Sequence, residues 1–144
     1  MSVIKLDYDK KVRWGKERFL QAVDILRLNV RNLRVFETSK GLHVSFETKR
    51  EFSDCEAVAI QAILGSDWKR EAYNVIRCRN GGSLGKHNVL FSKKWTYRNG
   101  EVVGFSEEVR REDIERELLS RIREIKESWK YMEEVRAFQF LQGS

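Results

Sequence analysis

Apolar and polar residues alternate along two stretches in the N-terminal half of the chain. The stretch Val3–Asp9 (VIKLDYD) has the period of two that indicates a half-buried strand. The stretch Leu33–Thr48 indicates two more strands, joined by a turn that contains Gly41. Apolar and polar residues alternate in the last of these strands as Leu42, His43, Val44, Ser45, Phe46 and Glu47. The sequence therefore predicts a strand and a hairpin, each with one apolar and one polar face.

Between these two stretches, from Lys16 to about Leu28, the spacing of apolar residues becomes that of an amphipathic helix. A strand, a helix and a hairpin in this order begin an α/β unit, in which the helix covers one face of the sheet. The apolar faces of the strands then pack against helices, and Asp7, Asp9 and His43 share the opposite face. We expect His43 to be accessible to solvent on that face.

Further elements follow the hairpin. A capping box at Ser53–Glu56 precedes an apolar helix at 58–64, and Ser66 or Asp67 caps a second helix that runs to about residue 76. A glycine-rich loop (80–86), a short strand (88–91) and a hairpin (95–105) that turns at Asn99-Gly100 come next. We expect the second helix to turn its apolar residues inward, namely Trp68, Ala72, Val75 and Ile76.

A long helix is predicted from about Glu107 to the C-terminus. Its apolar residues recur at steps of three and four, and they are Ile114, Leu118, Ile122, Ile125, Trp129 and Met132. The predicted fold is α+β: an open mixed or antiparallel sheet, similar to an RRM core, with helices on one face. Residues 1–105 form this core, and residues 106–142 form a helix that packs on the core or in a homodimer.

Composition limits the class of protein. The 144 residues suit one domain, and 41% hydrophobic with 35% charged residues suit a globular chain. No apolar run approaches the ~18 residues of a membrane span, so we expect no membrane partner and a cytoplasmic location. Cys55 and Cys78 lack a metal-binding spacing and are expected to be reduced, buried thiols. The absence of proline together with many Lys, Arg and Glu residues suits a thermophile.

Charge is distributed unevenly along the chain. Residues 1–105 contain 20 basic and 12 acidic residues, a balance of +8, whereas residues 106–144 contain 8 and 10, a balance of −2. The excess of positive charge in residues 1–105 favours nucleic acid as a partner. The alternative is that these Lys and Arg residues only keep the protein soluble. Basic and aromatic residues that suit phosphates and bases lie together at Lys93, Lys94, Trp95 and Arg98.

Two motifs carry candidate chemistry. Asp7 and Asp9 lie about 7 Å apart on one face of a strand, which suits Mg²⁺ or Mn²⁺; the alternative is two solvated acids. His43 on the same face could contact a phosphate or transfer a proton, or make one ordinary hydrogen bond. The loop at 80–86 lacks the residues of a Walker A motif, which excludes P-loop ATPase chemistry, although Lys86 could contact a phosphate.

The order VIKLDYD, helix and RVFETSKGLHV resembles the catalytic core of the archaeo-eukaryotic primase superfamily, in the small divergent form of archaeal plasmids and viruses. The resemblance implies that Asp7 and Asp9 hold catalytic metals and that His43 binds the nucleotide. It places Ser39 and Lys40 in the motif turn, and it suggests Asp67 as a third acid and Arg77 as a phosphate-binding arginine.

The function that we expect is that of a minimal, primase-like, metal-dependent nucleotidyltransferase in the replication of a mobile element. Its partners would be nucleic acid, DNA in preference to RNA, and a nucleoside triphosphate. One alternative is a non-catalytic nucleic-acid-binding protein with the same fold. Another is a small metal-dependent nuclease that uses the same carboxylates.

Overall fold

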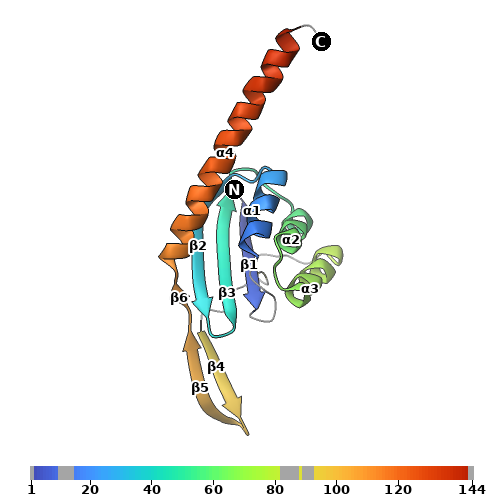
Figure 1. Cartoon of the computed structure of the whole chain (residues 1–144). Coiled ribbons are helices and arrows are strands. Elements are labelled where there is room, and N and C mark those ends of the chain that lie inside the picture. The colour runs from blue at the N-terminus through green and yellow to red at the C-terminus, as the bar shows by residue number, and fades with distance from the viewer. Residues whose placement is uncertain (1, 10–14, 82–87, 89–92, 143–144) are drawn as a thin grey trace.

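The computed structural model describes residues 2–9, 15–81, 88 and 93–142, with the backbone alone for 93–98 and 103–106 (Figure 1). Its elements, in chain order, are β1 (Ser2–Asp9), α1 (Lys16–Ile25), β2 (Val30–Thr38), β3 (Gly41–Thr48), α2 (Asp54–Ile63), α3 (Trp68–Arg79), β4 (Lys93–Arg98), β5 (Glu101–Glu107), β6 (Val109–Arg110) and α4 (Glu112–Leu141). Residues 89–91 of the short strand predicted at 88–91 lie outside the described residues, as does Lys86.

Four strands form an open antiparallel sheet in the order β1-β3-β2-β6. Because β3 is antiparallel to both of its neighbours, β1 and β2 run in the same direction with β3 between them. The strand, helix and hairpin of the sequence therefore make a split β-α-β unit, with α1 as the crossover (Figure 1). β4 and β5 form a separate two-stranded ribbon that turns at Asn99 and Gly100, as predicted. The predicted α+β class is confirmed.

The hydrophobic core lies on the face of the sheet that the alternation predicts. Ile4 and Leu6 of β1 lie opposite Phe46 and Val44 of β3, and all four side chains are buried. Phe19 of α1 meets Phe46 edge to face, with the ring centroids 6.1 Å apart. Helices α1, α2 and α4 contribute further buried side chains, among them Leu20, Val23, Val58, Leu118 and Ile122.

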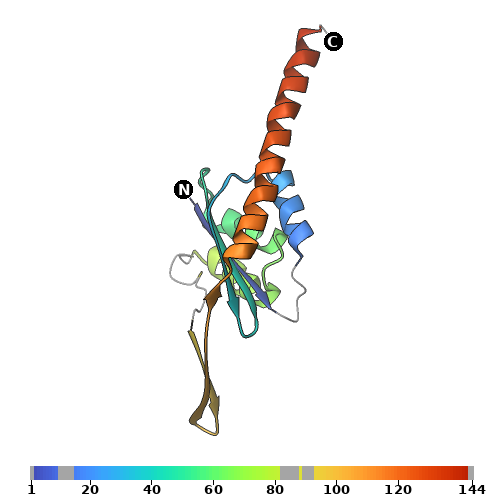
Figure 2. The same ribbon diagram turned by 60° about the vertical axis from the view of Figure 1, so that its left-hand side comes forward.

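The first turns of α4 pack on β2 and α1, and the rest of the helix extends past the body (Figure 2). Leu118 and Ile122 are buried in the shared core, and Ile114 and Ile125 pack against it. The predicted packing of this stripe on the body is thus confirmed for its first four members. Met132 was expected to continue the stripe, but 55% of its surface is exposed because the body does not reach that far along the helix. None of the helices in the described ranges is both long and apolar enough to cross a bilayer.

The orientation of α3 is opposite to the prediction. Its buried residues are the polar Glu71 and Asn74, whereas Trp68, Val75 and Ile76 are exposed, and Ala72 is exposed as well. The apolar pattern of α3 is helical, but its apolar face points away from the molecule. The reason is the strand at the open edge of the sheet, β1, whose outward-facing backbone groups need polar partners.

Strand β1 is an edge strand, and polar groups of the α2–α3 region satisfy its outward-facing backbone. Gln61 Oε1 accepts a hydrogen bond from the Lys5 amide at 3.1 Å, and Arg70 donates to the Lys5 carbonyl at 2.9 Å. Ser66 Oγ accepts from the Asp7 amide at 2.9 Å, and the Asp67 amide donates to the Asp7 carbonyl at 2.6 Å. These bonds take the place of a neighbouring strand and protect the edge from pairing with another chain.

Behind these contacts lies a buried polar network. Glu71 accepts hydrogen bonds from Gln61 Nε2 at 2.7 Å, from Asn74 Nδ2 at 2.9 Å and from the Arg70 guanidinium at 2.6 Å. Asn88 joins Gln61 and Arg70 through its own amide. The network explains why α3 turns its polar face inward, since a buried polar group without a partner would destabilise the fold.

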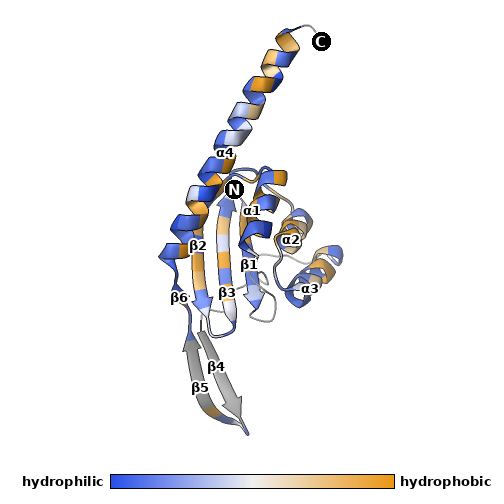
Figure 3. Cartoon of the chain, in the orientation of Figure 1, coloured by the Kyte–Doolittle hydropathy of each residue, from blue (hydrophilic) through white to orange (hydrophobic). Residues whose placement is uncertain are grey.

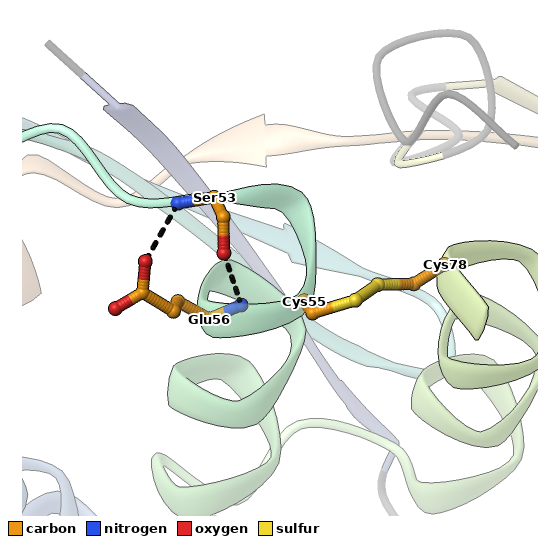
Figure 4. Close-up of a disulfide and its surroundings, with 4 residues drawn as sticks. All are labelled: Ser53, Cys55, Glu56 and Cys78. Atoms are coloured by element: carbon orange, nitrogen blue, oxygen red, sulfur yellow. Dashed lines mark hydrogen bonds between the residues drawn. A yellow bond between two sulfur atoms is a disulfide. The ribbon is translucent and has the colours of Figure 1, made fainter. Parts of the chain in front are cut away.

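Helices α2 and α3 are also linked covalently (Figure 4). The capping box predicted at Ser53–Glu56 is present and begins α2. Cys55, in the first turn of α2, forms a disulfide with Cys78, in the last turn of α3. The expectation of two reduced, buried thiols is therefore wrong: Cys55 is exposed and Cys78 half-buried. Two cysteines 23 positions apart gave no indication that two helices would bring their Cα atoms within 5.6 Å.

Candidate functional site

The central pair of the candidate site is Asp7 of β1 and His43 of β3. The two residues lie directly opposite each other in the antiparallel ladder, and residues paired in this way project from the same face. His43 Nε2 lies 3.6 Å from Asp7 Oδ1. The expectation that Asp7 and His43 share the face opposite to Phe46 is confirmed, because the period of two in both strands fixes it.

His43 is more enclosed than the sequence suggested. Only 8% of its surface is exposed, so the prediction of a solvent-accessible histidine is wrong. Its second ring nitrogen, Nδ1, lies 3.4 Å from Glu108 Oε2, so the imidazole sits between two carboxylates. Glu108 immediately precedes β6, which adds to the edge of β2. The sequence placed residue 108 in the long helix, and a strand of two residues is too short to leave a periodic pattern.

The carboxyl group of Asp7 titrates in an unusual environment. Burial raises the pKa of Asp7, the charges of His43 and Arg70 act to lower it, and the negative charges of Asp67 and Asp9 raise it further. Arg70, which sequence reasoning missed, is therefore the arginine whose charge acts on this site. Arg77, the predicted phosphate-binding arginine, is half-buried about two turns further along α3.

Asp67 lies beside Asp7 because the end of α2 returns to the edge of β1. Its backbone amide donates to the Asp7 carbonyl oxygen at 2.6 Å. Its carboxylate accepts a hydrogen bond from the Arg70 amide at 3.2 Å and so caps α3. Of the two caps that the sequence left open, Asp67 is the one used, and Ser66 instead binds β1. The predicted third acid is thus close to Asp7, with its carboxylate engaged at the start of a helix.

Strand β1 and the β2–β3 hairpin turn reach the same lower end of the sheet in Figure 1, and Asp9 is the last residue of β1. Asp9 pairs with Gly41, and a side chain at position 41 would place its Cβ 1.7 Å from the Tyr8 carbonyl oxygen. Only glycine allows the turn to approach β1 this closely. Ser39 and Lys40 are exposed beside it, and Thr38 Oγ1 accepts hydrogen bonds from the amides of residues 40 and 41.

We asked whether these residues suit a divalent ion. Within the described ranges, no group of three or more His, Cys, Asp or Glu side chains is arranged to hold a metal. Asp7 and Asp9 alone would supply two carboxylates about 7 Å apart. Mg²⁺ is commonly held by one or two carboxylates together with the phosphates of a substrate. Two carboxylates of this kind are the number of protein ligands that such a substrate-bound Mg²⁺ commonly has.

The other predicted nucleic-acid contacts lie in β4. Its backbone pairs with β5 from Lys93–Glu107 to Arg98–Glu101. The side chains of Lys93, Lys94, Trp95 and Arg98 lie outside the described part of the chain. Their predicted role stays a prediction.

Comparison of the chain with family models, with curated proteins and with solved structures found no match.

Proposed function

We propose that this protein is a primase-like, metal-dependent nucleotidyltransferase that acts on nucleic acid. The observation that carries the proposal is the cross-strand pair of Asp7 and His43, on the sheet face opposite the core, with Asp67 beside it. Asp7 and Asp9 would hold Mg²⁺ or Mn²⁺, which when bound neutralises charge on the triphosphate.

The geometry suggests a revised role for His43. A side chain that is 8% exposed presents little surface to a nucleotide, but its Nε2 faces the Asp7 carboxylate at 3.6 Å. We therefore propose that His43 positions Asp7, and that Glu108 holds the imidazole from the other side. Arg70, held against the Lys5 carbonyl oxygen, would contribute positive charge near the triphosphate.

The partner that we propose is single-stranded nucleic acid, DNA in preference to RNA. The outer face of α3 supports this, since Trp68 and Tyr73 are 68% and 66% exposed. Lys69 and Arg79 are exposed on the same helix, while its only acid, Glu71, is buried in the polar network. Exposed aromatic rings among cations stack bases and neutralise phosphates.

A double variant tests the catalytic proposal. Asp7→Asn with Asp9→Asn should abolish metal-dependent nucleotide incorporation on a primed or unprimed DNA template, because both proposed metal ligands are lost. DNA binding should survive, since removing two negative charges weakens no phosphate contact. Glu127→Gln, which neutralises an exposed carboxylate on α4, is the control and should keep full activity.

The second candidate is a non-catalytic nucleic-acid-binding protein. It is favoured by the enclosure of His43 and by the lack, in the described part of the chain, of a ready-made metal-ligand group. This candidate predicts salt-sensitive DNA binding but no incorporation by the wild type on any template. It also predicts no rise in melting temperature with Mn²⁺ and a nucleoside triphosphate together, whereas a bound metal–nucleotide pair would stabilise the folded protein.

We place the protein inside the cell, in the replication of an archaeal virus or plasmid from a hot environment. The Cys55–Cys78 disulfide is compatible with this setting, because intracellular proteins of hyperthermophiles retain disulfides that mesophilic cytosol would reduce.

We also propose that the protein is a homodimer joined through the protruding half of α4.

A further inference from the structure

A second candidate site lies at the opposite end of the sheet from Asp7 and His43. It is a pocket of about 420 Å³ between the loop that follows α1 and the segment that leaves β3. Thr48, at the pocket, lies five positions along β3 from His43, a span of about 17 Å. The pocket is lined by Leu26, Arg27, Leu28, Asn29, Thr48, Lys49, Arg50 and Phe52.

The charged lining of this pocket is entirely basic. Arg27, Lys49 and Arg50 contribute three positive charges, and no lining residue is acidic. In the described part of the chain, no carboxylate forms an ion pair with Arg27 or Lys49. The charge of Arg50 contributes to the lowered pKa of Glu56, whose carboxylate is already bonded to the Ser53 amide in the capping box.

The surroundings add to the positive charge. Lys126 of α4 donates to Asn29 Oδ1 at 2.5 Å, just behind the lining. Burial and the charge of Arg31 lower the pKa of Lys126. Cations gathered at one place repel one another, and a bound anion would relieve that repulsion.

The backbone at Arg27 supports a role for its side chain. Arg27 ends α1 in the left-handed conformation, with φ of 53°, at a position where glycine or asparagine is usual. Its guanidinium lies over the ring of Trp129, 5.2 Å from the centroid, and Trp129 Nε1 donates to Asp24 Oδ1 at 2.6 Å. Helix α4 therefore contacts the side chain of Arg27, a residue that lines the pocket and has a strained backbone.

Leu26, Leu28 and Phe52 supply the apolar part of the lining, and the Arg50 guanidinium lies over the Phe52 ring, 5.3 Å from its centroid. A pocket of this size with apolar walls and a cationic rim suits a ligand that joins a flat apolar group to phosphates. We propose that this pocket binds a nucleotide, with the phosphates at Arg27, Lys49 and Arg50 and the base against the apolar walls. This proposal does not rest on the proposed activity at Asp7 and His43.

The test measures binding of ATP, pyrophosphate and adenosine to the full chain by calorimetry, without added metal. ATP should bind more tightly than either of the other two, because only ATP offers both groups. Arg27→Asn and Lys49→Gln should each weaken ATP binding about tenfold or more, as expected for loss of a charged contact. Asn tolerates the left-handed backbone, so Arg27→Asn should keep its melting temperature. Lys49→Gln leaves the backbone at residue 27 untouched.

Two controls make the outcome decisive. Arg116→Gln removes one positive charge from an exposed position of α4 and should leave ATP binding unchanged. Asp7→Asn should also leave it unchanged, whereas loss of ATP binding in Asp7→Asn with retention in Arg27→Asn would move the nucleotide to the other site. Absence of ATP binding to the wild type at millimolar concentration would overturn the proposal. Equal affinity for pyrophosphate and ATP would mean that the pocket recognises only phosphate groups, and it would overturn the assignment of a nucleotide.

Discussion

At the scale of single residues, the candidate site depends on the register in which β1 pairs with β3. Asp7 faces His43 because the β1–β3 ladder pairs these two positions, and a slip by one residue would place Asp7 opposite an apolar side chain. Gly41 fixes that register, since no other residue could approach the Tyr8 carbonyl oxygen as closely. Burial at this position then raises the pKa of Asp7.

Asp7 leads to a prediction about stability and pH. Its pKa is raised on folding, so the folded chain takes up this proton at a higher pH than the unfolded chain does, and the ionised carboxylate destabilises the fold. Asp7→Asn should therefore raise the melting temperature at neutral pH, and the gain should vanish at about pH 3, where both side chains are uncharged. A lower melting temperature at neutral pH would show that attraction to His43 outweighs burial.

Asp113 provides a control of the opposite sign. The guanidinium of Arg111 lowers the pKa of Asp113 to about 2. A lowered pKa means that the ionised carboxylate favours the folded state at neutral pH. Asp113→Asn should therefore lower the melting temperature at neutral pH, and the loss should shrink as the pH falls toward 2. The two variants together test the direction of each shift in the same thermal-unfolding experiment.

At the scale of elements, α3 is governed by the edge of β1. The apolar stripe of a helix normally faces the core. Here the inward face of α3 must instead be polar, because the backbone amides and carbonyls of Lys5 and Asp7 need hydrogen-bond partners. The helix turns Arg70, Glu71 and Asn74 toward the sheet and leaves its aromatic residues outside. The same rotation that stabilises the edge thus creates the surface proposed to bind nucleic acid.

Glu71→Ala tests the importance of this buried network. The change leaves the Arg70 guanidinium and two buried amides without their acceptor, so we expect a loss of about 3 kcal/mol in the free energy of unfolding. Glu117→Ala removes a carboxylate that pairs with Lys16 on the surface, and should cost about 0.5 kcal/mol. Urea unfolding measures both. Equal losses would contradict a dominant role for the network.

At the scale of the whole molecule, α4 carries apolar residues both where it packs on the body and where it extends past it (Figure 3). The first face packs on the body and ends at Trp129, which Asp24 and Arg27 hold. A second apolar stripe then begins at Tyr131 and continues through Val135 and Phe138. Val135 lies six positions after Trp129, which turns the second stripe about 120° away from the first. The body of the same chain therefore cannot cover it, and a second copy is the occupant that we propose.

The dimer can be tested with two phenylalanines that lie two positions apart. Phe138, 62% exposed, belongs to the second stripe, whereas Phe140, 82% exposed, lies on nearly the opposite side of the helix. Sedimentation should find a dimer for the wild type and for Phe140→Ser, and a monomer for Phe138→Ser. A monomeric wild type would refute the dimer, and dissociation by both variants would refute the assigned face.

The sequence by itself determined the local elements. The period of two in Val3–Asp9 and Leu33–Thr48, the capping box at Ser53–Glu56 and the long apolar stripe of α4 each depend on neighbours close in the chain. Local spacing also sets which strand face a residue occupies, so Asp7 and His43 were correctly placed on one face. No long-range information was needed for these features.

Only the tertiary structure decided what surrounds those elements. The burial of His43 by Glu108, the inward polar face of α3, the Cys55–Cys78 disulfide and the basic pocket each join segments far apart in sequence. An apolar stripe predicts that one face of a helix differs from the other, but it does not say which face meets the sheet. Here the unpaired backbone of an edge strand made that choice, because unmet hydrogen bonds there would cost more than exposed apolar side chains on α3.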